Sequence, residues 1–320
     1  MIKTSWLNKN QTMPRVVEPV NKVARESSTS VTDWVTNHQD RIEQELLGHG
    51  ALLFRGFPFQ TAEEFEAFCR SFGSELMNYV GGDSPRQLVT QRVYTSTSVP
   101  SKDEIPLHSE MSYAHQWPRK VLFFCRTAPQ EGGQTTIGDC RKILDLIDPE
   151  IRERFERKQV QYVQNLHGGW GLGRSWQQQF ETTEPSVVED FCRKAGIDFK
   201  WKDDGGLWIR QVRQAVATHP VTGERLWFNQ VDQWHRSKWR PEDLNAMLKI
   251  MKEDELPHDA FYGDGSPIAA ADLDSIRHVY HQAEVLFPWQ QGDVLLLDNM
   301  LTAHGRKPFR GPREILVAMS

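Results

Sequence analysis

Seven short segments of this sequence have the composition of β-strands, and they limit the possible fold more than any other feature. Each is rich in β-branched and aromatic residues, and turn residues such as Thr222-Gly223 and Gly132-Gly133 separate them. They do not alternate regularly with helices, as the strands of a doubly wound sheet would. The sequence therefore predicts a mainly β fold, an antiparallel double sheet with peripheral helices. The segments are RQLVTQRVY (86–94), KVLFFCRTA (120–128), VQYVQN (160–165), RQVRQAVATHP (210–220), RLWFNQ (225–230), DVLLLDN (293–299) and REILVAM (313–319).

The length of the chain, 320 residues, is large for one domain but suits a β domain that carries insertions. The polar opening predicts an N-terminal arm over residues 1–30. The remainder, residues 31–320, is predicted to be a single domain with helical insertions at about 140–285.

Helical patterns occur outside the predicted strands. Residues 30–50 predict one helix that ends at Gly48, because glycine is a common helix stop. Residues 61–73 predict a second helix, since Thr61 and Glu64 have the spacing of a capping box. Further helices are expected at about 185–195, 241–253 and 270–285.

Composition excludes several classes of function. The net charge is −5 and the pI is about 6.1, so the chain has no basic face for nucleic acid. No run of apolar residues is long enough to span a membrane, and the start lacks a secretory pattern, so we expect a cytoplasmic protein. The oligomeric state has no signature in the sequence. We expect the four cysteines, which have no metal-binding spacing, to be reduced and buried: Cys69, Cys125, Cys140 and Cys192.

The stretch IPLHSEMSY (105–113) places His108 and Glu110 one residue apart. On a strand, residues i and i+2 face the same side and lie within about 7 Å, so both side chains could reach one metal ion. A second His-x-acid triplet, His38 to Asp40, lies in a predicted helix, where such side chains point about 200° apart. We therefore interpret only the first triplet as half of a metal site.

A third ligand is needed, and the best candidate lies near the C-terminus. There an apolar strand ends at Asp298-Asn299, a short loop is predicted to carry His304, and the last strand begins at Arg313. Two histidines and one carboxylate form a facial set that leaves half of an octahedral ferrous site open. Zinc would suit the same donors. The guanidinium of Arg313, predicted to lie near His304, indicates that an anion lies beside the metal.

These motifs, taken in order, resemble those of the TauD/TfdA group of Fe(II)- and 2-oxoglutarate-dependent dioxygenases, over about residues 50–320. LHSEMSY, FNQ and HGRKPFRGPR look most similar to the hydroxylases of nonribosomal peptide pathways, among them the aspartyl β-hydroxylase of syringomycin biosynthesis. The ordered motifs are His108-x-Glu110, Gly132-Gly133-Gln134-Thr135, Asp298-Asn299, His304-Gly305-Arg306 and Pro312-Arg313-x-Ile315.

The resemblance implies a double-stranded β-helix, or jelly roll, of the clavaminate synthase-like type. It also implies that His108, Glu110 and His304 bind Fe(II), and that 2-oxoglutarate and O2 are co-substrates. In related halogenases a small residue replaces the carboxylate ligand, so the presence of Glu110 favours hydroxylation over halogenation.

Arg313 is the predicted partner of the far carboxylate of 2-oxoglutarate, because a guanidinium can hold a carboxylate through two parallel hydrogen bonds. Thr135 resembles the co-substrate threonine of the family and is expected to assist it. Arg306 and Arg310 are alternatives, and Arg313 could instead pair with Asp298.

Predictions for the substrate rest on weaker signals. Asn229 and Gln230 end a hairpin strand in a stretch that borders the substrate pocket of related hydroxylases, although turn capping would also explain an asparagine there. Asn78 and Tyr79 are further candidates. The glycine-rich segment 165–176 is interpreted as a lid, or as a surface loop.

The resemblance implies a hydroxylase of an amino acid or amino-acid-derived small molecule, free or held on a carrier protein, in secondary metabolism such as antibiotic biosynthesis. Succinate and CO2 would be the co-products. Two alternatives remain: a catabolic dioxygenase of a small sulfonate or ether, and a non-catalytic jelly-roll binding protein.

Overall fold

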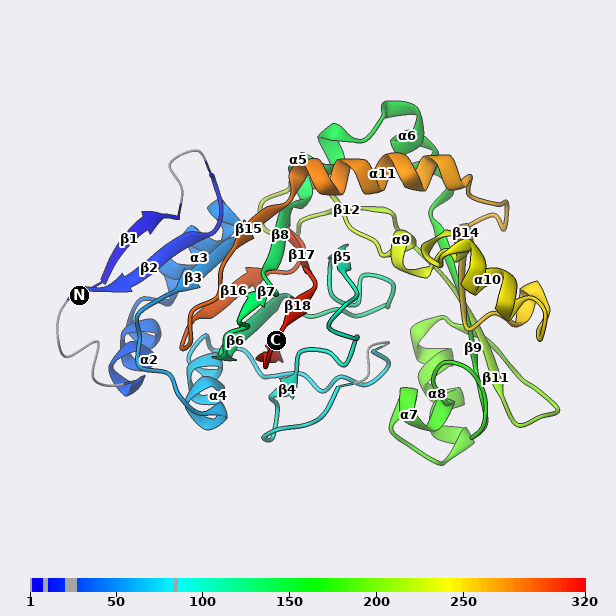
Figure 1. Cartoon of the computed structure of the whole chain (residues 1–320), viewed down its shortest axis with the longest axis horizontal. Helices are drawn as coiled ribbons and strands as arrows, with labels where there is room; N and C mark the ends of the chain where they lie inside the picture. The colour runs from blue at the N-terminus through cyan, green and yellow to red at the C-terminus, as the bar shows by residue number, and fades with distance from the viewer. Residues whose placement is uncertain (1, 8–10, 21–27, 83–85) are drawn as a thin grey trace.

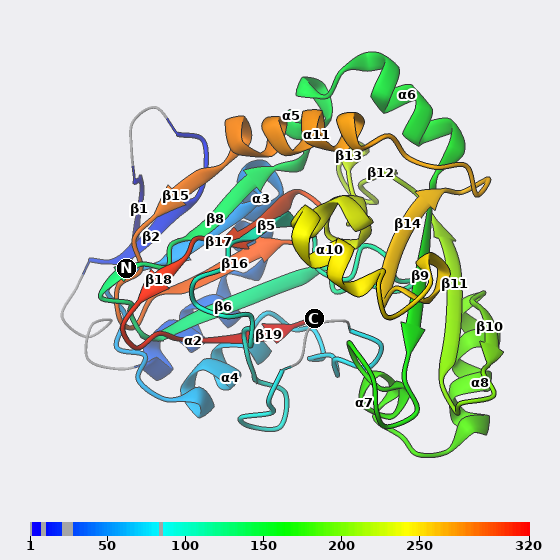
Figure 2. The same ribbon diagram turned by 45° about the vertical axis from the view of Figure 1, so that its right-hand side comes forward.

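Two facing β-sheets form the centre of the molecule in the computed structural model, which describes residues 2–7, 11–20, 28–82 and 86–320 (Figures 1 and 2). The large sheet has the order β1-β2-β3-β16-β6-β19-β4, and the small sheet has the order β15-β8-β17-β5. The strands of the large sheet are β1 (Ile2–Trp6), β2 (Arg15–Pro19), β3 (Ala51–Phe54), β16 (Val294–Asp298), β6 (Lys120–Thr127), β19 (Glu314–Met319) and β4 (Tyr94–Thr95). Those of the small sheet are β15 (Val285–Phe287), β8 (Thr135–Asp139), β17 (Thr302–Arg306) and β5 (Ile105–His108).

Both faces of the large sheet are covered, which explains why its central strands are almost entirely apolar. Alternate side chains of β6 point to opposite faces, so that Phe123 belongs to the cluster between the sheets and Phe124 to the outer cluster. The outer face packs against α2 (Ser28–Asn37), α3 (Gln39–His49) and α4 (Ala62–Arg70). The jelly roll that the sequence predicts is therefore confirmed as a two-sheet core.

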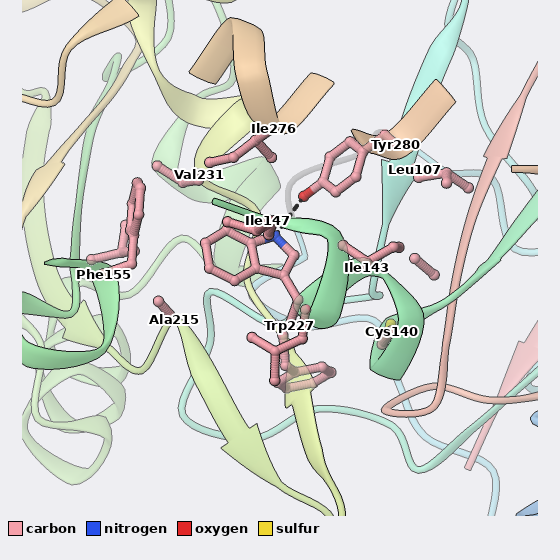
Figure 3. Packing of buried hydrophobic residues seen from close by; sticks show 14 of the residues in the cluster. Leu107, Cys140, Ile143, Ile147, Phe155, Ala215, Trp227, Val231, Ile276 and Tyr280 are labelled. Atoms are coloured by element: carbon pink, nitrogen blue, oxygen red, sulfur yellow. Dashed lines mark hydrogen bonds between the residues drawn. The ribbon is translucent and has the colours of Figure 1, made fainter. Parts of the chain in front are cut away.

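The small sheet is covered on its far side by α5 (Cys140–Leu146) and α11 (Ala270–Ala283). Figure 3 shows Trp227 of β13 (Arg225–Trp227) in the middle of this core, where its indole N–H donates to the Tyr280 hydroxyl at 2.9 Å. Ile143 and Ile276 complete the packing around it. This core fixes α11 beside the small sheet.

The region between β8 and β15 contains helices, as predicted, but also a third sheet with the order β10-β11-β9-β14 (Figure 1). Its strands are β9 (Val160–Leu166), β10 (Asp198–Trp201), β11 (Leu207–Arg213) and β14 (His258–Tyr262). The helices around it are α6 (Pro149–Lys158), α7 (Trp176–Phe180), α8 (Pro185–Ala195), α9 (Val231–Trp234), η1 (Arg236–Lys238), α10 (Pro241–Met247) and η2 (Glu253–Glu255). Two short pairs, β12 (Val216–Thr218) with β13 and β18 (Phe309–Arg310) with β7 (Glu131–Gly132), complete the fold.

The structure differs from the prediction in the N-terminal arm and in the first helix. The predicted arm contains β1 and β2, which extend the large sheet; residues 1, 8–10 and 21–27 of that arm lie outside the described residues. The predicted single helix over 30–50 is two helices and ends at Gly50. It breaks because the His38 ring bonds the Trp34 carbonyl at 2.8 Å, and the His38 N–H donates to Val35 instead.

The predicted strand over 86–94 is mostly a tight turn. The Val89 and Thr90 N–H groups both donate to the Val93 carbonyl, so the segment folds back on itself and only β4 joins the sheet. Similarly, the predicted strand over 210–220 is divided between β11 and β12. Local composition favours a strand over 86–94, but the backbone hydrogen bonds of that segment are made within the turn.

Two expectations from composition can be compared directly with the structure. All four cysteines are buried and unpaired, as predicted. Within the described ranges, no helix combines the length and the apolar character that a membrane crossing requires.

Candidate active site

His108, Glu110 and His304 come together between the two sheets. Their potential ligand atoms all lie within 4.8 Å of one another, and the two imidazole rings are 4.4 Å apart. Strand pairing explains the convergence, because β17 is hydrogen-bonded to β5 with His304 opposite His108. Residues distant in the sequence thus form one compact donor set.

The local backbone of this cluster differs from the prediction. His304 lies on β17 and not in a loop, and β5 ends at His108, so Glu110 lies in the following turn. Strand alternation therefore does not bring the pair together. The chain turns sharply instead, and Met111 has a φ of +54°, a conformation that favours glycine.

Asn299 holds this turn in place. Its side-chain oxygen accepts from the Glu110 N–H at 2.7 Å, and its amide nitrogen donates to the Glu110 carbonyl at 2.9 Å. The same nitrogen donates to the Pro118 carbonyl at 2.8 Å. Because Asn299 is fully buried, these hydrogen bonds have no competition from water.

The neighbouring Asp298 shapes the turn that leads to His304. One of its oxygens accepts from the backbone N–H groups of Met300 and Leu301, both at 2.9 Å. The other oxygen lies 3.2 Å from Nε2 of His219. Asp298 is thus occupied within the turn, and Arg313 does not pair with it.

The donor set fits a ferrous ion. Nδ1 of His108 lies 3.0 Å from the Pro106 carbonyl, so it carries the proton and leaves Nε2 as a potential ligand. Nε2 of His304 lies 3.6 Å from Oε2 of Glu110, which places both atoms toward the same point. Two imidazoles and one carboxylate are the donors of a facial Fe(II) site.

Burial and charge hold these groups in the protonation states that a metal needs. Burial, together with the nearby His304, lowers the pKa of His108 to about 4. Burial alone would raise the pKa of Glu110, but Arg86 and the two histidines outweigh it and hold that pKa well below its usual range. At neutral pH the imidazole of His108 is therefore neutral and Glu110 is ionised, as metal binding requires.

Arg86 is a member of this site that the sequence analysis missed. Its Nη2 donates to Oε2 of Glu110 at 2.8 Å, and the exposed fraction of its side chain is only 5%. The guanidinium stacks on the Tyr79 ring, 4.2 Å from its centroid. Since Arg86 lies in a segment predicted to be a strand, no local pattern marks it.

A cavity of about 640 Å³ opens beside the cluster, large enough for a small organic substrate and a co-substrate together. His108, His304, Arg86, Phe123 and Ile315 line its inner part. The outer part is more polar and is formed by α9, η1 and α11, with Asp232, Gln233, Ser237, Lys238, Trp239, Arg277, Tyr280, His281 and Glu284.

Arg313 supplies a cation in the wall of the cavity. Only its Nε has a protein partner among the described residues, the Gly133 carbonyl at 3.1 Å, so its terminal nitrogens can receive an anion. Burial and the nearby Arg306 lower the pKa of Arg313 to about 10, and the group stays charged at neutral pH. Thr135 accepts from the Trp289 indole N–H at 3.0 Å, which leaves its own hydroxyl proton to donate.

Arg306 and Arg310 have other surroundings. Arg306 is buried, and its terminal nitrogens donate to the carbonyls of Val99, Pro100 and Asp103. Arg310 lies on the surface, where its side chain is 85% exposed. Of these three arginines, Arg306 and Arg313 line the cavity, and Arg313 is the one whose terminal nitrogens have no acceptor among the described residues.

None of the four residues predicted to contact substrate lines this cavity. The Asn229 side chain donates to the Ala215 carbonyl and accepts from the Val231 N–H. Gln230 donates at 2.7 Å to the carbonyl of Ser109, the residue between His108 and Glu110 in the chain. Asn78 accepts from Arg92 and borders a second cavity of about 180 Å³. Tyr79 lies beneath Arg86.

Two other features do not contribute to the proposed metal site. No residue of the segment 165–176 lines the cavity, and Trp170 is 99% exposed, so the segment has the features of a surface loop. A second group of possible metal ligands, Glu104, His281 and Glu284, contains a cation already. The Lys307 ammonium lies 2.7 Å from Glu104 and 2.8 Å from Glu284.

Comparison with known proteins supports this description. The family described as "Taurine catabolism dioxygenase TauD, TfdA family" matches residues 17–319, and the chain belongs to this family. The dapdiamide synthesis protein DdaC of Enterobacter agglomerans is 38% identical over 92% of this chain and 89% of its own length. A clavaminate synthase-like protein of Arabidopsis thaliana is 29% identical over 90% of this chain and 86% of its own length.

Solved structures show the same fold. The crystal structure of PvcB from Pseudomonas aeruginosa aligns with a TM-score of 0.55 at 19% identity, over 99% of this chain and 90% of that one. A further structure of PvcB, described as an Fe, alpha-ketoglutarate dependent oxygenase from an isonitrile synthetic pathway, aligns with a TM-score of 0.54.

Proposed function

We propose that this protein is an Fe(II)- and 2-oxoglutarate-dependent hydroxylase of an amino acid or amino-acid-derived molecule in secondary metabolism. One observation carries the proposal: His108, Glu110 and His304 meet at one end of a cavity that also contains the unpaired terminal nitrogens of Arg313. A metal site alone would fit many proteins. A metal site beside a buried guanidinium fits a chelating organic diacid.

In this proposal His108, Glu110 and His304 hold the ferrous ion and leave adjacent positions open for 2-oxoglutarate and O2. The bound iron and co-substrate supply the oxidising power, and succinate and CO2 are the co-products. The protein orients the ligands: Pro106 fixes the tautomer of His108, and Asn299 fixes the backbone at Glu110. Phe123 packs edge-on against His304, with the two ring centroids 5.0 Å apart, and gives one side of the imidazole an apolar neighbour.

Arg313 and Thr135 bind the far carboxylate of 2-oxoglutarate. The charge-assisted hydrogen bonds of the guanidinium fix the position of the diacid, and the Thr135 hydroxyl donates to the same group. Arg306 supports this end of the cavity by tying the segment 99–103 to β17 through its three carbonyl bonds. Thr135 lies on the small sheet and Arg313 directly precedes β19 of the large sheet, so the two residues would hold this carboxylate from strand ends in different sheets.

The substrate class is inferred from the relatives and the cavity. DdaC acts in dapdiamide synthesis and PvcB in an isonitrile pathway, according to their descriptions, so amino-acid-derived substrates are favoured over sulfonates. The outer wall, with the buried carboxylate of Asp232 and the cation of Arg277, suits a polar, charged molecule. The four buried thiols suit the reducing cytoplasm, where we expect the reaction to occur.

Mass spectrometry tests this proposal. The purified protein, supplied with Fe(II) and 2-oxoglutarate, is incubated with a panel of amino acids and their carrier-bound thioesters. We expect at least one compound to gain one oxygen atom while succinate forms in equal amount. Release of sulfite from taurine would support a catabolic enzyme instead, and absence of succinate under all conditions would support a non-catalytic binding protein.

A further inference from the structure

Two cationic side chains lie at opposite ends of the inner cavity. Arg313 directly precedes β19, whereas Nη1 of Arg86 lies 3.8 Å from the sulfur of Met319 at the end of the same strand. Six residues of extended strand span about 20 Å. Between these ends, Val317 pairs with Phe123, whose ring contacts His304. The proposed metal site therefore lies between Arg313 and Arg86.

Most hydrogen-bonding capacity of Arg86 is unused. A guanidinium has five N–H donors. In Arg86, Nη2 bonds Glu110, Nη1 meets only the weakly accepting sulfur of Met319, and Nε is buried with no partner among the described residues. Tyr79 supports one face of the group and keeps it beside the cavity. Buried donors of this kind require an acceptor, and since the described residues offer Nε none, a bound molecule or water can supply it.

Charge supports the same conclusion. If Glu110 binds a divalent metal, its charge is already balanced, and a second cation in contact with it is unfavourable in a buried site unless another anion is close. The far carboxylate of 2-oxoglutarate is proposed to bind at the other end, at Arg313. A negative group on the substrate would balance the charge of Arg86.

We propose that Arg86 binds a carboxylate of the substrate, on the opposite side of the metal ligands from Arg313. This inference rests on the proposed function and narrows it. The substrate then carries a carboxylate within a few bonds of the oxidised carbon, as a free amino acid does. A substrate held as a thioester qualifies only if it keeps a second carboxylate, in its side chain.

The first test needs no identified substrate and measures binding only. Calorimetry compares Mn(II) affinity, and then the affinity for N-oxalylglycine as an analogue of 2-oxoglutarate, in the wild-type protein and Arg86→Gln. Mn(II) affinity is expected to fall, because Arg86→Gln loses the contact with Glu110. At saturating Mn(II), we expect the affinity for N-oxalylglycine to stay within about threefold, because Arg86 serves a different ligand. A tenfold or greater loss of N-oxalylglycine affinity at saturating Mn(II) would show that Arg86 serves the co-substrate, and would overturn the inference.

The second test uses the substrate that the oxygen-incorporation assay identifies, and its carboxamide. We expect the wild-type protein to prefer the acid, and Arg86→Gln to raise the KM for the acid by about 10- to 150-fold, the range for a lost charge-assisted pair. Arg86→Lys keeps the charge but not the planar guanidinium, so its KM for the acid should lie between those of the wild-type protein and Arg86→Gln. Arg126→Gln is the matched control, since its ion pair with Glu314 lies on the surface.

Equal turnover of acid and carboxamide by the wild-type protein would contradict the inference, as would an unchanged KM in Arg86→Gln. Failure of the proposed function gives a different result. In that case the wild-type protein itself would bind neither Mn(II) nor N-oxalylglycine, whatever residue stands at position 86.

Discussion

At the scale of single residues, two of the three proposed ligands, His108 and Glu110, depend on a neighbour that never touches the metal. His108 is oriented by the Pro106 carbonyl, and Glu110 by the buried amide of Asn299. Such partners fix tautomer and direction, and their loss weakens metal sites even when every ligand remains. Arg86 differs from these neighbours, because it contacts Glu110 and also lines the cavity.

Removal of one ligand tests the metal site. We expect His108→Ala and Glu110→Ala each to abolish iron-dependent formation of succinate, because two donors do not hold a facial ferrous ion. The control is His38→Ala, which changes the histidine of the other His-x-acid triplet, on the surface. Succinate formation at the wild-type rate in either ligand variant would refute the assignment.

Arg313→Ala tests the co-substrate site. The variant loses a charge-assisted pair, which contributes about 1.5–3 kcal/mol, so the concentration of 2-oxoglutarate needed for half-maximal activity should rise about 10- to 150-fold. The affinity for iron should change little. Arg310→Ala is the control, because that side chain is exposed. A similar effect in both variants, or none in Arg313→Ala, would show that Arg313 does not bind the far carboxylate of 2-oxoglutarate.

The sequence predicts ligand types well and their surroundings poorly. Only Ser109 separates His108 from Glu110, and His304 lies in a motif that resembles the family's, so sequence patterns are sufficient to propose them as ligands. Arg86 has no such pattern, because packing on Tyr79 and Met319 brings it to the site. Asn229 was predicted to face substrate, yet its amide bonds the backbone of its own hairpin.

At the scale of elements, the close pairing of β17 with β5 and β8 determines where His304 lies. Gly305 makes this pairing possible. A Cβ at this position would lie 2.4 Å from the Ile105 carbonyl oxygen and 2.6 Å from the Thr136 hydroxyl. No side chain fits there without moving a strand.

Gly305→Ala should therefore separate β17 from β5. We expect a loss of about 1–3 kcal/mol in the free energy of unfolding, the range for overpacking, measured by urea denaturation. Mn(II) affinity should fall at the same time, because His304 moves with the strand. Gly48→Ala provides the control: no atom lies within 4 Å of the added Cβ, and alanine in a helix is stabilising. Unchanged Mn(II) affinity in Gly305→Ala would contradict this role.

Strands with long apolar runs were predictable from the sequence, and turns within mixed segments were not. β6, β16 and β19 are buried on both faces, so their composition alone identifies them. The segment 86–94 has the same kinds of residues, but its N–H groups bond within the turn. Local composition cannot distinguish these two uses of the backbone hydrogen bonds.

At the scale of the whole molecule, the fold consists of layers that enclose the site (Figure 2). Helices α2 to α4 cover the large sheet, α5 and α11 cover the small sheet, and the proposed metal site lies between the sheets. Cys69, Cys125 and Cys140 lie in these cores, and Cys192 packs between α8 and the third sheet. None of the four lines the cavity. The N-terminal strands β1 and β2 belong to the same body, which the polar opening sequence did not predict.

Thiol labelling measures the integrity of this packing. Burial raises the pKa of Cys125 and of Cys140 to about 12 and that of Cys192 to about 11, and it also raises the pKa of Cys69. The native protein at pH 8 should therefore react with no alkylating reagent within minutes, whereas all four thiols should react in denaturant. Rapid labelling of the native protein would show that these layers open.

The account depends most on the convergence of His108, Glu110 and His304 on one ion. Anomalous X-ray scattering at the iron edge, from crystals prepared with Fe(II) without oxygen, tests this directly. We predict a single iron peak in contact with both imidazoles and the carboxylate, at the inner end of the cavity that holds Arg86 and Arg313. A peak elsewhere, or a His304 ring several ångströms from the iron, would contradict the account.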